Sequence, residues 1–246
     1  PFAHTIRYHR WARADMEDDV GAKQAPLQSP ALMRCEAGQV QRPARRDAFL
    51  RRPGRFEFYE RKYACGKEAP RSSKVYSLGY VPVGGHLRVL DVGCGSGLNS
   101  RRIAERGHAV VGIDASVEAI RKFSSGGFDG RVMDIESHLE LDDDQFDIVF
   151  CSEVIEHTMN PENVMREMYR VLRPGGKMIL SAPNSAFWAY RLAALLGLTV
   201  SDLQHQKHLQ FFSRRSLRRL AVRAGFYPEV ESGRNMYLVA PHPSSP

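Results

Sequence analysis

One short stretch constrains the fold of this chain more than any other: an apolar run that ends in an acidic residue and three alternating glycines. It covers residues 89–97, reads VLDVGCGSG, and is followed by a helical pattern from Leu98 to Arg106. Such a pattern predicts a buried β-strand, a tight turn and the N-terminus of a helix. Because glycine has no Cβ, the backbone of this turn can come close to a ligand.

Strand and helix patterns alternate from Leu87 onward, which predicts an α/β fold with a doubly wound parallel sheet. Pro161 suits the first position of a helix, and Ser213 suits the N-cap of a later one that Gly225 ends. The last two expected strands, 227–231 and 236–240, are candidates for an antiparallel hairpin. The other expected elements are strands 88–92, 109–113, 128–133, 146–151 and 177–181, and helices near 99–106, 116–123, from 161 and from 213.

The run 91–97 resembles the first motif of class I S-adenosylmethionine (SAM)-dependent methyltransferases, D/E-x-G-x-G-x-G. Residues 172–177, LRPGGK, resemble the turn before the fifth strand of that family. The resemblance covers about residues 60–240, and the chain is most similar to ubiquinone-pathway O-methyltransferases. It implies a Rossmann-like, seven-stranded sheet in the order 3-2-1-4-5-7-6, with strand seven antiparallel, and methylation of an oxygen on a small, partly apolar acceptor.

The chain is expected to divide into an extension and one domain. Residues 1–50 mix Pro, Arg, Asp and Gln without periodicity, which predicts a poorly ordered basic extension. Residues 51–246 would form the methyltransferase domain, with cap helices at 51–82 over the cofactor mouth and a lid or substrate insert at 184–212. The leucine-rich insert could instead lie in a membrane interface or pack on the sheet.

The charge and composition of the chain limit the kinds of partner and the location that we expect. The net charge is +7, and the excess arginines gather in residues 42–55 and 214–223. Such segments can attract nucleic acid or an anionic membrane, although a solvated tail and helix face are the simpler interpretation. No run of about 18 apolar residues is present to span a bilayer. The four scattered cysteines and the lack of a signal-peptide pattern favour reduced thiols and a cytoplasmic location.

The cofactor site is expected at the carboxyl ends of the strands, where ligands bind in open α/β sheets. Asp114 follows the second strand and can accept hydrogen bonds from both ribose hydroxyls, unless it only caps a helix. The resemblance implies that Asp134 faces the adenine amino group; the alternative is a turn residue. The cofactor-binding candidates are Asp91, Gly93, Cys94, Gly95, Asp114, Ala115, Met133, Asp134, Ile135, Cys151 and Ser152, the last two through their backbone.

An acidic turn follows the fourth strand. Residues 153–157 read EVIEH, and a helical turn would project its carboxylates and imidazole to one side. Oxygen ligands with an imidazole suit Mg, Mn, Fe or Zn, so Glu153, Glu156 and His157 are candidate metal ligands. The turn resembles that of metal-dependent O-methyltransferases, and in the small-RNA type a later histidine completes the site; His208 is the first choice for it and His205 the second.

The role of the histidines and the nature of the acceptor stay open. His157 and His208 are the catalytic candidates, and without a metal His157 could contact the substrate or act as a general base. Metal-dependent 2′-O-methylation of RNA is an alternative that the arginine segments would serve, although no separate RNA module is evident. A SAM-binding module without catalysis is the other alternative.

Overall fold

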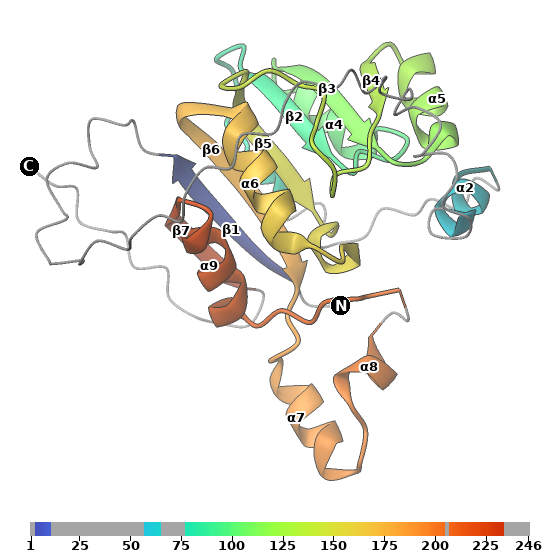
Figure 1. Cartoon of the computed structure of the whole chain (residues 1–246), viewed down its shortest axis with the longest axis vertical. Helices are drawn as coiled ribbons and strands as arrows, with labels where there is room; N and C mark the ends of the chain where they lie inside the picture. Colours follow the sequence, from blue (N-terminus) through green and yellow to red (C-terminus); the bar gives the residue numbers. More distant parts are fainter. Residues whose placement is uncertain (1–2, 11–56, 65–76, 205–206, 234–246) are drawn as a thin grey trace, which may run out of the picture.

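A mixed β-sheet forms the centre of the structure (Figure 1). The computed structural model describes residues 3–10, 57–64, 77–204 and 207–233. Its strands are β1 (Ala3–Arg10), β2 (Arg88–Val92), β3 (Ala109–Asp114), β4 (Asp129–Val132), β5 (Phe146–Ser152), β6 (Leu172–Pro183) and β7 (Phe226–Gly233). Its helices are α2 (Glu57–Ala64), α4 (Leu98–Ala104), α5 (Val117–Ser125), the 3-10 helix η2 (Ile155–His157), α6 (Pro161–Val171), α7 (Trp188–Leu195), α8 (Val200–Leu203) and α9 (Arg214–Arg223).

Five parallel strands correspond to strands that the sequence predicted, and β7 corresponds to the strand expected at 227–231. The five parallel strands lie in the order β4-β3-β2-β5-β6, and every neighbouring pair among them is parallel. From β2 the chain runs outward to β3 and β4, then returns to place β5 on the other side of β2. This reversal beside β2 is the position at which open α/β sheets bind ligands. The expected doubly wound α/β class is therefore confirmed.

The antiparallel side of the sheet differs from the expectation. β1 lies between β6 and β7 and pairs antiparallel with both, so that in the backbone register Ile6 is paired with Leu180 of β6 and with Glu231 of β7. The resemblance had put a strand from the end of the chain in this position, and the expected strand 236–240 lies outside the described residues. Residues 3–10 were expected in a poorly ordered extension. This segment forms a strand because it pairs with β6 and β7, and its own composition does not indicate that pairing.

Apolar side chains cover both faces of the parallel strands. Alternate residues point to opposite faces, so Leu90 joins a cluster with side chains of α6 and α9, whereas Val89 joins a second cluster with Ile103 of α4. The helices therefore lie in two layers, one on each face of the sheet, as a doubly wound fold requires.

The predicted helix starts are confirmed by their capping bonds. The Ser116 side chain accepts a hydrogen bond from the backbone N–H of Ala119 at the start of α5. Asn160 caps α6 with Pro161 in its first turn, and Ser213 caps α9. Each cap satisfies a backbone donor that would otherwise lack a helical partner.

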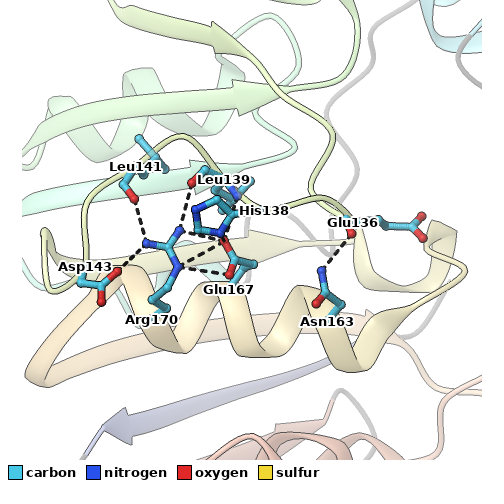
Figure 2. Close-up of polar contacts among 8 residues, drawn as sticks. All are labelled: Glu136, His138, Leu139, Leu141, Asp143, Asn163, Glu167 and Arg170. Atoms are coloured by element: carbon cyan, nitrogen blue, oxygen red, sulfur yellow. Dashed lines mark hydrogen bonds and ion pairs between the residues drawn. The ribbon is translucent and has the colours of Figure 1, made fainter. Parts of the chain in front are cut away.

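The loop between β4 and β5 is tied to α6 by a polar network (Figure 2). The Arg170 guanidinium donates to the carbonyl oxygens of Leu139 (3.0 Å) and Leu141 (2.8 Å), and it pairs with Glu167 at 2.7 Å. Glu167 in turn accepts from the backbone N–H of Leu139 at 2.8 Å. The loop that leaves the end of β4 is thereby fixed against α6.

The insert after β6 projects away from the sheet. In Figure 1, α7 and α8 extend below the rest of the molecule. α7 has no buried residue, and Leu195 and Leu196 are each 81% exposed. Packing on the sheet, one of the three interpretations of this insert, is therefore wrong for α7. Among the described residues, no helix is long and apolar enough to cross a membrane.

Candidate active site

The glycine turn lies directly after β2 at the carboxyl-end edge of the sheet. Gly93, Gly95 and Gly97 have φ values of 68°, 57° and 90°, a region that side chains with a Cβ rarely adopt. The N–H groups of Gly93 and Cys94 both donate to the Ile113 carbonyl, at 2.8 and 3.1 Å. These bonds hold the turn against the end of β3.

Asp91 is the last acidic residue before this turn, and it is buried. Its Oδ2 accepts a hydrogen bond from Ser100 Oγ of α4 at 2.5 Å. The carboxylate therefore connects the end of β2 to the first turn of α4. Cys94 is also buried, and its side chain packs with Ile120 and Phe123 of α5.

Asp114 connects the glycine turn to the helix that follows β3. Its Oδ2 accepts from the Gly95 N–H at 3.0 Å, and its Oδ1 accepts from the Ser116 N–H at 2.9 Å. The N-cap of α5 is Ser116, so Asp114 does not have the N-cap role that was its alternative. The half-buried Ala115 lies between the two. Asp114 is thus held within hydrogen-bonding distance of the turn, where its ribose role stays a prediction.

The loop after β4 brings Met133, Asp134 and Ile135 to the same edge. The Met133 N–H donates to the Asp114 carbonyl at 3.0 Å, and Met133 and Ile135 pack against the core on the α6 side. Asp134 Oδ1 accepts from the Glu136 N–H at 3.0 Å, which is the turn contact considered as its alternative role. Contact of Asp134 with adenine stays a prediction.

The two side chains at the end of β5 are not reactive, and a backbone role of Cys151 and Ser152 toward the cofactor stays a prediction. Burial, followed by the nearby carboxylates of Glu156 and Asp91, raises the pKa of the Cys151 thiol, so this cysteine stays protonated and is a poor nucleophile. The Ser152 hydroxyl lies 2.9 Å from that of Ser181 on β6, within the sheet.

Helix α2 lies over the glycine turn and carries two residues that sequence reasoning did not single out as site residues. A Cβ placed on Gly95 would lie 2.7 Å from the Tyr63 hydroxyl oxygen, so Tyr63 covers the turn. The Tyr59 ring is 6.0 Å from the His157 ring, in an edge-on arrangement. Two tyrosines spaced by four residues share one face of a helix, and this spacing was the available signal.

Three possible metal ligands converge near the glycine turn, because a Cβ placed on Gly93 would lie 2.5 Å from the side chain of Val154, the residue that precedes η2. One donor atom from each of Glu156, His157 and His208 lies within 4.8 Å of the others. Glu156 and His157 belong to η2, and the segment carrying His208 is attached to η2 because the N–H groups of Leu209 and Gln210 donate to the Glu156 carbonyl at 2.8 and 3.0 Å. The cluster therefore joins two segments that are distant in the sequence.

Hydrogen bonds orient both imidazoles toward the centre of the cluster. His157 Nδ1 lies 2.9 Å from the Lys207 carbonyl, which can only accept, so Nδ1 carries the proton and a neutral ring has its lone pair on Nε2. His157 Nε2 is 3.9 Å from Glu156 Oε1. His208 Nδ1 lies 3.0 Å from Gln204 Oε1, which favours the same tautomer. Metal-binding histidines commonly donate their second N–H to such an acceptor, so this donor set fits a divalent cation.

Glu153, the third candidate metal ligand, is not part of this cluster. The helical turn begins only at Ile155, and Glu153 precedes it with a φ of 59°, so the shared helical face on which its candidacy rested does not form. Its carboxylate instead accepts from Ser181 Oγ at 3.4 Å. His205, the second choice for the later histidine, lies outside the described residues.

The sequence of this chain is similar to those of known methyltransferases. A family model described as a methyltransferase domain matches residues 43–230. A ubiquinone biosynthesis O-methyltransferase of Psychrobacter arcticus is 30% identical over 186 residues, which are 71% of this chain and 70% of that protein. The corresponding protein of Pseudomonas entomophila is 39% identical over 114 residues, 44% of this chain and 49% of that protein. The chain thus spans about half the length of several curated relatives that it matches.

Solved structures are similar in fold. An S-adenosylmethionine-dependent methyltransferase from Mesorhizobium loti has a TM-score of 0.52 at 19% identity, over 65% of this chain and 83% of that one. The [4+2]-cyclase SpnF has a TM-score of 0.54 at 21% identity, over 71% of this chain and 70% of that one. A fold that includes a cyclase does not by itself fix the reaction. The family model and the Psychrobacter relative, however, each match more than half of the chain, and this chain belongs to the methyltransferase-domain family.

Proposed function

We propose that this chain is a SAM-dependent methyltransferase that methylates a hydroxyl oxygen of a small, partly apolar acceptor. The observation that carries the proposal is the convergence of Glu156, His157 and His208 beside the glycine turn. One edge of the sheet would then hold the methyl donor and the groups that activate the acceptor. The names of the curated relatives, ubiquinone biosynthesis O-methyltransferases, support oxygen as the methylated atom.

The cofactor would lie along the edge formed by the ends of β2, β3 and β4. Asp114 would accept hydrogen bonds from the ribose hydroxyls, because its two carboxylate oxygens are already oriented by the Gly95 and Ser116 N–H groups. Met133 and Ile135 would flank the adenine ring, with Asp134 facing its amino group. The methionyl part would lie against the glycine turn and the backbone at the end of β5.

Methyl transfer is an in-line displacement, so this site must position the acceptor oxygen opposite the sulfonium. The methyl carbon forms its new bond to the acceptor oxygen as its bond to sulfur breaks, and the sulfur leaves as a neutral thioether. The acceptor hydroxyl also loses its proton. His157 is suited to take it, because its Nε2 has the lone pair and the buried Glu156 carboxylate at 3.9 Å would stabilise the resulting imidazolium.

Because the His157 Nε2 lone pair cannot both take the proton and bind a metal, the alternative to general-base catalysis by His157 is a divalent cation. Glu156, His157 and His208 would hold it through one carboxylate oxygen and two Nε2 atoms, a set that suits Mn, Fe or Zn better than an all-oxygen site would. Bound there, it would act as a Lewis acid that lowers the pKa of the acceptor hydroxyl. The hydrogen bonds from the two Nδ1 atoms would keep both rings aimed at this position whether or not a metal is present.

The insert supports an apolar acceptor. It begins after β6, whose carboxyl end lies at the same edge of the sheet as the glycine turn. Its exposed side chains are mainly apolar and include Trp188, Leu192, Leu195 and Leu196. Closure of α7 over the site would bury this surface against an apolar acceptor. This lid role is the interpretation that the proposal adopts.

RNA 2′-O-methylation is a second candidate, and the basic face of α9 is the observation in its favour. The helix carries five exposed arginines, namely Arg214, Arg215, Arg218, Arg219 and Arg223. Such a row can neutralise backbone phosphates. It lies on the helix that follows the His208 segment directly in sequence.

A labelled-methyl assay decides between these functions. Wild-type protein and an Asp114→Ala variant would be incubated with methyl-labelled SAM and with quinols, catechols, amines, glycans and short RNA. Label on a quinol or catechol oxygen, reduced with Asp114→Ala at limiting SAM, supports the proposal, whereas label on the RNA ribose supports the second candidate. Label on an amine would refute O-methylation. SAM binding without transfer to any acceptor would indicate a binding module.

A further inference from the structure

Helix α2 is fixed to α5 by polar contacts at two points. The Glu60 carboxylate accepts from the backbone N–H groups of Val117 (2.7 Å) and Glu118 (3.1 Å), in the first turn of α5. Near the other end of α2, Lys122 Nζ donates to the Tyr63 carbonyl. Two attachments on one side of a short helix fix its rotation about its own axis. They therefore determine which side chains of α2 face the site.

The face so oriented carries Tyr59 and Tyr63, one helical turn apart. Tyr63 is buried and covers Gly95 of the cofactor turn. Tyr59 lies one turn nearer the N-terminus of α2, with its ring 6.0 Å from that of His157 at an interplanar angle of 77°. A single rigid helix thus touches the cofactor turn with one side chain and the acceptor-activating histidine with another.

The His157 ring has aromatic neighbours on two sides. Tyr59 contacts it from α2, and His208 contacts it at 5.0 Å with an interplanar angle of 66°. The hydrogen bond from Nδ1 to the Lys207 carbonyl selects the tautomer and anchors one edge of the ring. A bond along one direction leaves the ring able to tilt about it, and edge-on aromatic contacts oppose such a tilt because their geometry is specific.

We infer that Tyr59 is a positioning residue for His157, and that the contact of Glu60 with α5 holds Tyr59 in place. Tyr59 acts through its ring rather than through its hydroxyl, and it does not touch the reacting atoms. The inference rests on the proposed function for its catalytic consequence, but the ring contact itself exists without turnover. It assigns α2 a part in orienting the acceptor side of the site in addition to covering the cofactor.

Four variants separate this role from a general effect on folding. Tyr59→Leu removes the ring, and Tyr59→Phe keeps it. Glu60→Gln weakens the attachment to α5. The matched control is Glu57→Gln on the same helix, because Glu57 is exposed and, within the part of the chain that the structure describes, pairs with Arg61 one helical turn away, at 2.5 Å. Each variant would be examined for the NMR resonance of the His157 Cε1–H, for affinity for S-adenosylhomocysteine, and for kcat and KM with the best acceptor from the labelled-methyl assay.

Tyr59→Leu should move the His157 resonance and lower kcat about tenfold, because a tilted ring is a poorer proton acceptor; a tenfold change corresponds to about 1.4 kcal/mol. Affinity for S-adenosylhomocysteine should stay within about twofold, because the residues proposed to bind the cofactor are untouched. Tyr59→Phe and Glu57→Gln should match the wild type, and Glu60→Gln should change both readouts in the direction of Tyr59→Leu.

Two results would overturn the inference. One is a His157 resonance that does not move in Tyr59→Leu; the other is a loss of kcat in Tyr59→Phe as large as in Tyr59→Leu, which would assign the effect to the hydroxyl. Failure of the wild type to methylate any acceptor would instead refute the proposed function. The resonance would still decide whether the Tyr59 ring contacts His157 in solution.

Discussion

Replacement of Arg170 by alanine should release the β4–β5 loop from α6 and destabilise the protein strongly. Figure 2 shows the guanidinium reaching both the loop and its own helix. Arg170 donates to the carbonyls of Leu139 and Leu141 and to Glu167, and its side chain is only 20% exposed. Its contact with Asp143 at 2.6 Å is exposed on the carboxylate side and adds little.

The expected loss of unfolding free energy follows from the polar groups that no longer have Arg170 as a partner. Alanine would leave two loop carbonyls and the Glu167 carboxylate without their cationic donor. Hydrogen bonds to charged groups contribute roughly 1.5–3 kcal/mol when buried, and part of that is recovered where water can enter, so the total loss should be about 3 kcal/mol. Arg170→Lys should recover less than half of it, because an ammonium cannot reproduce the planar fork.

The loss of unfolding free energy caused by Arg170→Ala should also depend on pH. Burial alone raises the pKa of Glu167, but hydrogen bonds from Arg170 and from the Leu139 N–H outweigh it, and the pKa lies below its ordinary value. A carboxylate with a lowered pKa stabilises the folded state above its unfolded pKa of about 4.3 and loses this contribution as the pH falls through the folded value. The difference between wild type and Arg170→Ala should therefore narrow between pH 7 and about pH 3.

Urea denaturation at each pH would measure these differences from the shift in midpoint at constant slope. The control is Arg121→Ala, which removes an arginine that pairs with Glu118 at 2.7 Å within one exposed helical segment and should shift the midpoint far less. If Arg170→Ala and Arg121→Ala gave equal shifts at pH 7, the network would be no more than a surface ion pair and the reasoning would be wrong.

Three further outcomes test the site and the core. Asp114→Ala should weaken SAM binding by about 1.5–3 kcal/mol in titration calorimetry, since the ribose hydroxyls lose a charged acceptor; unchanged affinity in a folded variant would move the ribose site elsewhere. Chelation should lower turnover without lowering SAM affinity, Mg or Mn should restore it, and His208→Ala should raise the metal concentration required; full activity in excess chelator would refute the metal proposal. Gly112→Ala should reduce unfolding free energy by about 1–3 kcal/mol in urea, because its Cβ would lie 2.8 Å from Cys94 Sγ and closer still to the Phe123 ring; a neutral effect would mean that this contact relaxes freely.

The parallel half of the fold was predictable because its signals are local. Most of these strands are apolar runs bounded by turn residues, although the short β4, which reads DGRV, is not. Helices α5, α6 and α9 carry their own start signals. Pro161 behind Asn160, and Ser213 at the start of α9, are examples in which capping chemistry within four residues fixes an end. Local consistency of this kind needs no knowledge of the tertiary structure.

The site was predictable only in part, because it depends on how distant segments meet. His208 could be connected with His157 only through a resemblance, since the bonds that join them run from Leu209 and Gln210 to the Glu156 carbonyl. Glu153 looked like a ligand because the sequence does not reveal that its backbone turns to a positive φ. The spacing of Tyr59 and Tyr63 indicates that they share one face of α2, but the contact of Tyr59 with His157 depends on how α2 packs, which the sequence of α2 does not specify.

The position of β1 has a consequence for how this chain folds. Its partners β6 and β7 come from the other end of the described sequence, so Ile6 meets Leu180 only after most of the chain has been gathered. Long-range pairings of this kind form slowly, because the entropy of closing the loop is lost before the contact is gained. Until β1 is inserted, β6 and β7 present facing edges whose backbone groups can recruit a strand from another molecule. Refolding yield should therefore fall as protein concentration rises, with the vacant space between β6 and β7 as the place where neighbouring chains first join.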